Sequence, residues 1–191
     1  MTNQATENVT KTAAEICLDF ELTRDGRAVL RDDMMPGTFL SLLEQKQLYK
    51  DAIRFVAYLL PKRQAVWWGC LCVWETVRPT PPATIDLALQ AAVRWVQEPS
   101  EENRRAAEAP GKAVGVSVPA GAVALAAFWS GGSMSRPDLP IVPPPPLLTA
   151  KTIAGALVAA AEQGERGQLA DRYRRFLALA RDVDGGKNRW E

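Results

Sequence analysis

The amino-acid sequence predicts an all-α fold, an irregular orthogonal bundle of about eight or nine helices with a proline-rich strap before the last two helices. Two observations support this class. Apolar side chains recur with a period near 3.6 residues, most clearly at Leu48, Ala52, Phe55, Val56 and Leu59. Apolar residues make up 47% of the 191 residues and include six tryptophans among many alanines, and such large and small side chains suit closely packed helices.

The N-terminal part is predicted to contain a disordered tail at residues 1–11, then a helix, a turn and a second helix. Thr12–Leu22 carries apolar side chains at helical spacing, and Arg24–Gly26 has the composition of a turn. Pro36 is well placed to open a short helix, because an amide hydrogen has no helical partner in the first turn. We expect a single helical domain over residues 12–184.

A third observation concerns the segment Ala65–Trp74, which contains no charged or strongly polar side chain. A helix that is apolar on every side is a buried one, so we place this segment at the centre of the fold. A buried strand is the competing interpretation, but helical neighbours favour a helix. Those neighbours are a helix ended by Pro61, a helix over Thr84–Gln97, and a helix with Ser100 as N-cap that fades at Pro110–Gly111.

Proline-rich and glycine-rich segments divide the next part of the chain. Ser117 is predicted to cap a helix that continues to Trp129, and Ser130–Ser133 then ends it. The latter segment is similar to a phosphate loop only superficially, since it follows a helix and lacks the lysine of that motif. Residues 136–147 form the strap, with six prolines in its first eleven positions.

The last two helices complete the predicted bundle. Thr149 is expected to cap a helix that runs to about Gln163. The last helix, Gln168–Asp182, has the clearest amphipathic pattern in the chain, with an apolar face that should point inward: Leu169, Tyr173, Phe176, Leu177 and Ala180. Arg172 and Arg175 lie on its outer surface and are candidates for contact with a partner, and a tail follows at residues 185–191.

Composition argues against several functional classes. Lys and Arg total 23 and Asp and Glu total 22, which gives a net charge of +1. Nucleic-acid-binding proteins usually have a strong excess of basic residues, so a nucleic-acid partner is disfavoured. The chain has no histidine, and its three cysteines lack metal-site spacing, so no catalytic residue, cofactor or metal is predicted. No secretory signal is visible, and the most apolar stretch, Val114–Trp129, is too short to span a membrane. We expect a cytoplasmic protein without membrane insertion.

Two adjacent cations form one candidate binding site. Lys62 and Arg63 lie just inside a predicted helix start, where positive charge opposes the helix dipole. One interpretation is an anion site made with the free N–H groups of that helix. The other is a salt bridge to Asp51 or Glu44, or simple exposure to solvent.

Two further features have a functional and a structural interpretation. The strap ends in four consecutive prolines, Pro143, Pro144, Pro145 and Pro146, which present a preformed segment of the kind that SH3 domains bind. Alternatively the strap ties the domain together through its apolar residues Leu139, Ile141, Val142, Leu147 and Leu148. The second feature is a group of three tryptophans, which forms either an aromatic ligand pocket or plain core: Trp67, Trp68 and Trp74.

Four segments of the sequence are distinctive as strings: Asp51–Cys70 (DAIRFVAYLLPKRQAVWWGC), Trp95–Glu101 (WVQEPSE), Ala126–Ser133 (AAFWSGGS) and Pro143–Ala154 (PPPPLLTAKTIA). Together they resemble an uncharacterised family of Ala- and Trp-rich bacterial proteins that are often encoded beside type VI secretion genes. The resemblance covers roughly residues 13–162 and leaves out the last helix. It supplies no catalytic or binding residues. It implies a cytosolic accessory, adaptor or regulator of a contractile secretion machine.

These observations predict a non-catalytic helical module that binds another protein, of unknown identity, and uses no cofactor. Two alternatives come from other functional classes. An immunity protein that caps a toxin predicts tight one-to-one binding and a strongly charged face. An enzyme of unknown type predicts a deep pocket with converging polar groups.

Overall fold

The computed structural model describes residues 11–187, and within this range it contains helices and no β-strand, which confirms the all-α class. The predicted disordered tail lies outside the described residues except for Lys11, and residues 188–191 of the predicted C-terminal tail also lie outside them. The α-helices are, in order, α2 (Ala13–Cys17), α3 (Arg24–Val29), α4 (Pro36–Gln45), α5 (Tyr49–Leu59), α6 (Lys62–Val77), α7 (Ala83–Gln97), α8 (Glu101–Ala106), α9 (Glu108–Val114), α10 (Pro119–Phe128), α11 (Leu148–Glu162) and α12 (Leu169–Asp184).

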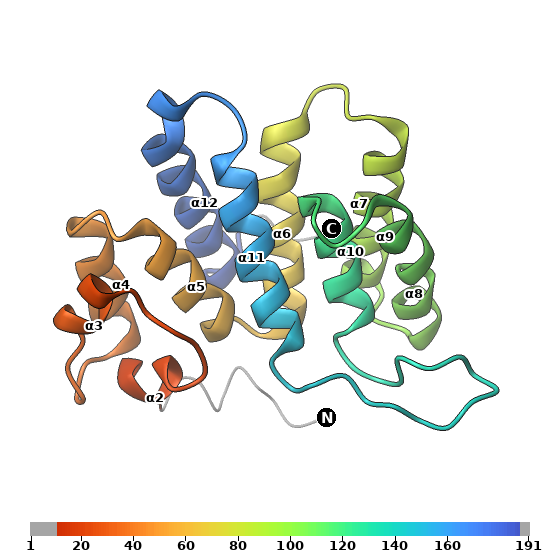
Figure 1. The fold of residues 1–191 in the computed structure, drawn as a ribbon, viewed down its shortest axis with the longest axis horizontal. Coiled ribbons are helices and arrows are strands. Elements are labelled where there is room, and N and C mark those ends of the chain that lie inside the picture. The colour runs from red at the N-terminus through yellow and green to blue at the C-terminus, as the bar shows by residue number, and fades with distance from the viewer. Residues whose placement is uncertain (1–10, 188–191) are drawn as a thin grey trace.

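Helix α6 lies at the centre of the molecule, as predicted for Ala65–Trp74. Figure 1 shows α2–α5 on one side and α7–α10 on the other, with α6 and α11 between them. Helix α6 packs against α7, α10, α11 and α12. Trp68 is fully buried, and its indole nitrogen donates a hydrogen bond of 2.7 Å to the carbonyl of Phe176 in α12. The largest side chain of the core therefore has its one polar atom satisfied.

The N-terminal helices are tied to α5 through one buried carboxylate. Asp51 is 1% exposed and accepts hydrogen bonds from the backbone nitrogen of Thr23, at 3.0 Å, and from the Thr23 hydroxyl. The Thr23 hydroxyl oxygen in turn accepts from the backbone nitrogen of Gly26 at 3.1 Å. This N-cap explains why Arg24–Gly26, predicted as a turn, instead begins α3. A side chain at Gly26 would collide with the Asp51 carboxylate, 2.3 Å from a Cβ there.

Helices α8, α9 and α10 differ from the prediction in two respects. The helix capped by Ser100 was expected to fade at Pro110–Gly111, but these residues lie inside a separate short helix, α9. Pro110 is the third residue of α9, where a missing amide hydrogen removes no helical bond. Helix α10 begins at Pro119 without a side-chain cap, so Ser117 does not have the predicted role. All ten residues of α10 are buried.

Three further helix starts were predicted from local signals, and two of these predictions are correct. Pro36 is the first residue of α4, and Ser100 caps α8 by accepting a hydrogen bond of 3.2 Å from the backbone nitrogen of Asn103. Thr149 does not cap α11, which begins one residue earlier. Its hydroxyl instead lies 3.3 and 3.2 Å from the carbonyls of Ala126 and Trp129, so it joins α11 to the end of α10.

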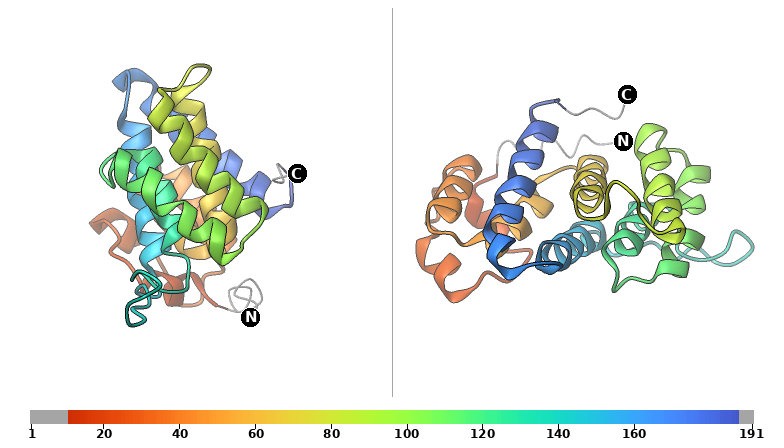
Figure 2. Two further views of the ribbon diagram at one scale, coloured as in Figure 1. Left: turned by 90° about the vertical axis from the view of Figure 1, so that its right-hand side faces the viewer. Right: turned by 90° about the horizontal axis from the view of Figure 1, so that it is seen from above.

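The strap precedes α11 and α12, as predicted, and a 3-10 turn (Arg166–Gln168) joins the two helices. Figure 2 shows the strap extending beyond the α8–α10 end of the molecule and away from α6. The predicted inner face of α12 is confirmed, with Tyr173, Phe176, Leu177 and Ala180 buried and Leu169 partly buried. No helix of the described range is both long and apolar enough to cross a membrane.

The close approach of α9 and α10 predicts that two glycine-to-alanine substitutions have opposite effects on stability. A Cβ at Gly121 in α10 would lie 2.3 Å from the Gly115 carbonyl oxygen, whereas a Cβ at the exposed Gly155 in α11 meets nothing within 4 Å. We expect Gly121→Ala to lower the free energy of unfolding by about 1–3 kcal/mol, as overpacking does. Gly155→Ala should raise it by about 0.5–1 kcal/mol. Urea denaturation measures both, and effects of the same sign would contradict this account of α10.

Candidate functional site: a tryptophan-lined groove and a proline-rich loop

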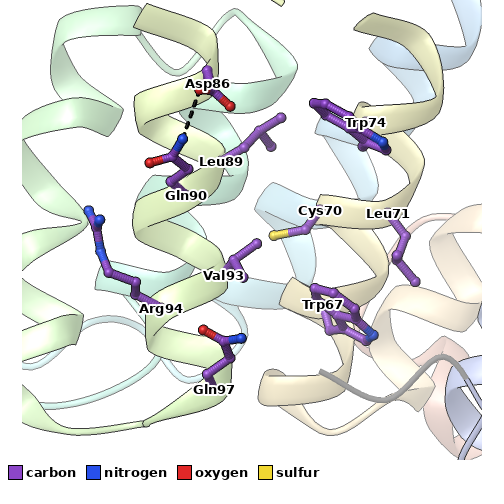
Figure 3. A pocket seen from close by; sticks show the side chains of 10 residues that line it. All are labelled: Trp67, Cys70, Leu71, Trp74, Asp86, Leu89, Gln90, Val93, Arg94 and Gln97. Carbon is purple, nitrogen blue, oxygen red and sulfur yellow. Dashed lines mark hydrogen bonds between the residues drawn. The ribbon is translucent and has the colours of Figure 1, made fainter. Parts of the chain in front are cut away.

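A groove runs along the surface between α6 and α7, and it encloses about 400 Å³. Trp67, Leu71 and Trp74 form its α6 wall, and Leu89 and Val93 are part of its α7 wall. Figure 3 shows Trp67 and Trp74 two turns apart on α6, with Cys70 between them pointing toward α7. The groove is therefore an apolar trough with an indole ring near each end.

The three tryptophans predicted as one group have two different roles. Trp68 belongs to the core, but Trp67 and Trp74 line the groove, and Trp74 is 41% exposed. Successive residues of a helix point about 100° apart, so neighbours cannot share a face. The prediction that Ala65–Trp74 is buried on every side is thus wrong for Trp74. Both interpretations of the tryptophans apply, each to different members of the group.

The polar groups of the groove lie at its α7 edge. They belong to Asp86, Gln90, Arg94 and Gln97. The Gln90 side-chain nitrogen donates a hydrogen bond of 2.7 Å to the Asp86 carboxylate, which lies at the Trp74 end of the groove (Figure 3). On the floor, burial raises the pKa of the Cys70 thiol to about 12, so this sulfur is protonated at neutral pH and is a poor nucleophile. The groove is suited to apolar contact with a polar edge.

The proline-rich strap, residues 136–147, is part of an exposed loop in the structure. This loop also includes Met134 and Ser135, and we call residues 134–147 the loop. Four of its apolar side chains, those of Leu139, Ile141, Val142 and Leu147, are between 37% and 81% exposed. Of the four consecutive prolines, Pro143, Pro145 and Pro146 are exposed and Pro144 is partly buried. The apolar residues expected to tie the strap to the domain therefore mostly face solvent. Only Leu148, which begins α11, is partly buried.

Hydrogen bonds at its base hold the loop in place. The hydroxyl oxygen of Ser133 accepts from the backbone nitrogen of Val142 at 3.1 Å, and the Met134 nitrogen donates to the Val142 carbonyl at 2.8 Å. Arg105 donates to the Ser135 carbonyl at 2.9 Å. The outgoing and returning segments of the loop are thus joined to each other and to α8.

Arg104 is the main anchor of the loop, and sequence analysis did not single it out. This arginine is 3% exposed, donates to the Phe128 carbonyl, and donates to the Ser133 carbonyl at 3.0 Å. Two of its nitrogens also bind the Glu101 carboxylate, at 2.6 and 2.7 Å. Its guanidinium carbon lies 4.9 Å from the centre of the Phe128 ring. The only sequence signal for this role is an acidic residue three positions before an arginine in one helix.

Lys62 and Arg63 begin α6, as predicted, but they bind backbone carbonyls. The Lys62 ammonium donates to the Ser130 carbonyl at 2.9 Å, and Arg63 donates to the carbonyls of Val96 and Gln97 at 2.6 and 2.9 Å. Burial lowers the pKa of both side chains. These contacts satisfy carbonyls at the ends of two other helices. The acids considered as partners bind elsewhere, Asp51 to Thr23 and Glu44 to Arg181.

The two arginines of α12 that were candidates for contact with a partner also contact the protein itself. Arg172 donates to the carbonyls of Ala161 and Glu165, at 2.7 and 3.0 Å, and so caps the end of α11. Arg175 is more exposed and pairs with Glu75 at 3.2 Å. The structure does not bring these arginines together with Lys62, Arg63 and the loop prolines in one site.

The glycine-rich segment and the three cysteines do not form a phosphate site or a metal site in the described part of the chain. Ser130–Ser133 follows α10, and Gly132 has a φ of +60°, consistent with a turn after a helix. Cys17, Cys70 and Cys72 are buried free thiols. Within residues 11–187 no group of three or more Cys, Asp or Glu side chains is placed to hold a metal ion.

A model of a family of unknown function (DUF6931) matches residues 39–184 of the chain. The chain belongs to this family. The DUF6931 match covers the groove, the loop and all of α12, so the last helix is included, although the resemblance in the sequence ended near residue 162. No curated protein matches the chain, and no solved structure does.

The anchoring role of Arg104 predicts unequal effects of replacing two adjacent arginines. Arg104→Met removes the donor to the Phe128 carbonyl and leaves the Ser133 carbonyl with only the 3.4 Å hydrogen bond from Arg105, and we expect it to lower the free energy of unfolding by about 2–4 kcal/mol. Arg105→Met is the matched control at a more exposed position, and its loss should stay below about 1 kcal/mol. Denaturant unfolding measures both. Equal losses would show that Arg104 is not the anchor.

The Glu101 carboxylate predicts that the loop loosens in acid. Hydrogen bonds from Arg104, with a smaller contribution from Arg105, lower the pKa of Glu101 in the folded protein. This stabilisation is complete above the unfolded pKa of about 4.3 and is lost as the pH falls through the lower folded value. Hydrogen exchange at the Met134 and Val142 amides should therefore become less protected in acid. Glu101→Gln should remove that part of the pH dependence, and an unchanged profile would contradict it.

Proposed function

We propose that this protein is a non-catalytic helical module that binds another protein through its exposed proline-rich loop. We further propose that it acts in the cytosol as an accessory or adaptor factor of a type VI secretion system. The single observation that carries the binding proposal is the exposure of Leu139, Ile141, Val142 and Leu147 on one ordered loop.

Exposure of this kind is a physical argument for a partner. Single exposed apolar residues are common on protein surfaces, but contiguous exposed apolar segments mark sites of interaction. Ile141 is 81% exposed and its neighbours Pro140 and Val142 are also exposed. A partner that covered this segment would remove apolar surface from water, at about 25 cal/mol for each Å².

The rigidity of the loop supports the same proposal. Proline fixes the backbone φ angle, and the hydrogen bonds from Arg104, Arg105 and Val142 hold the two ends of the loop. A segment that is already ordered loses little conformational entropy when it binds. The loop thus combines accessible apolar surface with a low entropic cost of association.

The proposed place in type VI secretion rests on the resemblance carried by four sequence segments, of which Pro143–Ala154 includes part of the loop. The two cations that an anion-binding function would use, Lys62 and Arg63, already bind backbone carbonyls. The groove between α6 and α7 is lined mainly by apolar side chains, which supports binding over catalysis.

Affinity capture from the native host with two matched variants tests this function. Tagged wild-type protein should enrich a specific protein partner, identified by mass spectrometry. Ile141→Ser should reduce its recovery at least about fivefold, because truncating a central apolar contact costs more than about 1 kcal/mol. Leu18→Ser is the control, because Leu18 is equally exposed, at 81%, but lies after α2 and outside the loop. Enrichment of no partner, or equal loss with both variants, would refute the proposal.

A further inference from the structure

Prolines recur at every third position of the loop, at residues 137, 140, 143 and 146. A polyproline helix has three residues per turn, so residues spaced by three lie along one edge of it. Pro140 and Pro143 are both exposed, and the run from residue 140 to 145 contains no turn or helix. Two prolines one turn apart are therefore accessible on an extended segment.

The groove between α6 and α7 has aromatic rings at a matching interval. Trp67 and Trp74 are seven residues apart on one face of α6, a rise of about 10.5 Å. Three residues of a polyproline helix rise about 9.3 Å. Aromatic-lined grooves are the surfaces that bind such segments. Pro140 and Pro143 can therefore rest against Trp74 and Trp67 at the same time.

The charges of the two surfaces are complementary when the segment runs from Trp74 toward Trp67. Arg136 precedes Pro140 and then lies at the Trp74 end of the groove, where Figure 3 shows the Asp86 carboxylate. In the free molecule Arg136 pairs with Asp138 at 3.0 Å, and both side chains are largely exposed. An exposed ion pair contributes little to stability, so Arg136 can exchange this partner for Asp86 at small cost.

We infer that the proline-rich loop of one copy of this chain docks in the α6–α7 groove of a second copy. Arg104 and Arg105 fix the base of the loop at α8 and α10, and Figure 2 shows the loop extending away from α6, so the contact is between molecules. This inference rests on the proposed function in that it uses the same loop, and it names a second copy of the chain as one of its partners.

The two copies contribute different surfaces, which makes the contact head-to-tail. Such a contact leaves one loop and one groove unoccupied, so assembly continues to longer chains unless the rotation between copies closes a ring. The loop is shorter than the roughly 20–30 residues that each partner contributes to a standard interface. Self-association is therefore weak and increases with protein concentration.

The first test measures binding of the loop alone. A fluorescein-labelled peptide with the sequence of residues 135–147, SRPDLPIVPPPPL, is titrated with the full chain, and its anisotropy should rise to saturation. The same peptide with Pro140→Ala and Pro143→Ala should bind at least about fivefold more weakly. Trp74→Ala in the protein should have a similar effect, with thermal unfolding as the check that it folds. Asp86→Arg, at the edge of the groove, is the second variant of the protein. It should also weaken peptide binding, because it replaces the carboxylate that faces Arg136 with a positive charge. Absence of binding to the wild-type protein overturns the inference.

The second test uses complementary variants of the full chain in sedimentation velocity experiments. The wild type should sediment faster as its concentration rises, and Leu18→Ser should behave like the wild type. Pro140→Ala/Pro143→Ala, which keeps the groove, and Trp74→Ala, which keeps the loop, should each remain monomeric. A mixture of the two variants should form dimers and nothing larger, because each supplies one intact surface. A wild type that stays monomeric at every concentration overturns the inference.

The two proposals fail separately in these experiments. A monomeric protein that does not bind the peptide, but still captures a host protein through Ile141, removes self-association and leaves the proposed function. A protein that self-associates but enriches no other host protein removes the proposed function as stated and leaves the head-to-tail contact.

Discussion

The packing of α6 determines most of this structure. A helix with ten consecutive apolar residues has to be covered on nearly every side, and α7, α10, α11 and α12 cover it. Alanine-rich α10 can approach closely, because a Cβ at Gly69 of α6 would lie only 3.0 Å from a Val123 methyl carbon. The remaining uncovered strip carries Trp67 and Trp74. The apolar sequence of α6, which builds the core, therefore also supplies one wall of the groove.

The C-terminal end of α10 is held by polar contacts. Side chains from three other helices converge on it: Arg104 donates to the Phe128 carbonyl, Lys62 to the Ser130 carbonyl, and Thr149 lies within hydrogen-bond distance of the Trp129 carbonyl. Carbonyls at a helix end have no partner within their helix, and cations there also complement the helix dipole. The base of the loop follows directly, so the same contacts that complete α10 determine where the loop leaves the body. Lys62, one of the two cations that suggest an anion site in the sequence, is used for this purpose, and Arg63 binds carbonyls at the end of α7 in the same way.

The sequence predicted most features that depend on neighbouring residues, apart from the caps expected at Ser117 and Thr149, and missed those that depend on contacts between distant residues. The amphipathic face of α12, Pro36 at the start of α4 and Ser100 as a cap are local and were found. Helix α3 was missed because its cap, Thr23, is stabilised by Asp51, 28 residues away. The exposed strip of α6 could not be located either. In a run in which every residue is apolar, no polar residue marks which face of the helix is exposed to solvent. Arg104 was missed because its burial depends on carbonyls more than 20 residues away.

The composition of the loop explains how a protein can display so much apolar surface on one segment. An exposed apolar strand with free backbone N–H groups pairs with the edges of other strands and aggregates. Six of the eleven residues from 136 to 146 are prolines, which have no N–H to donate, and the amide of Val142 is already bound to Ser133. The loop therefore cannot easily extend a sheet, although its side chains remain accessible. Recognition of such a segment must come from a surface that contacts rings and side chains rather than from backbone pairing, and an aromatic groove is a surface of that kind.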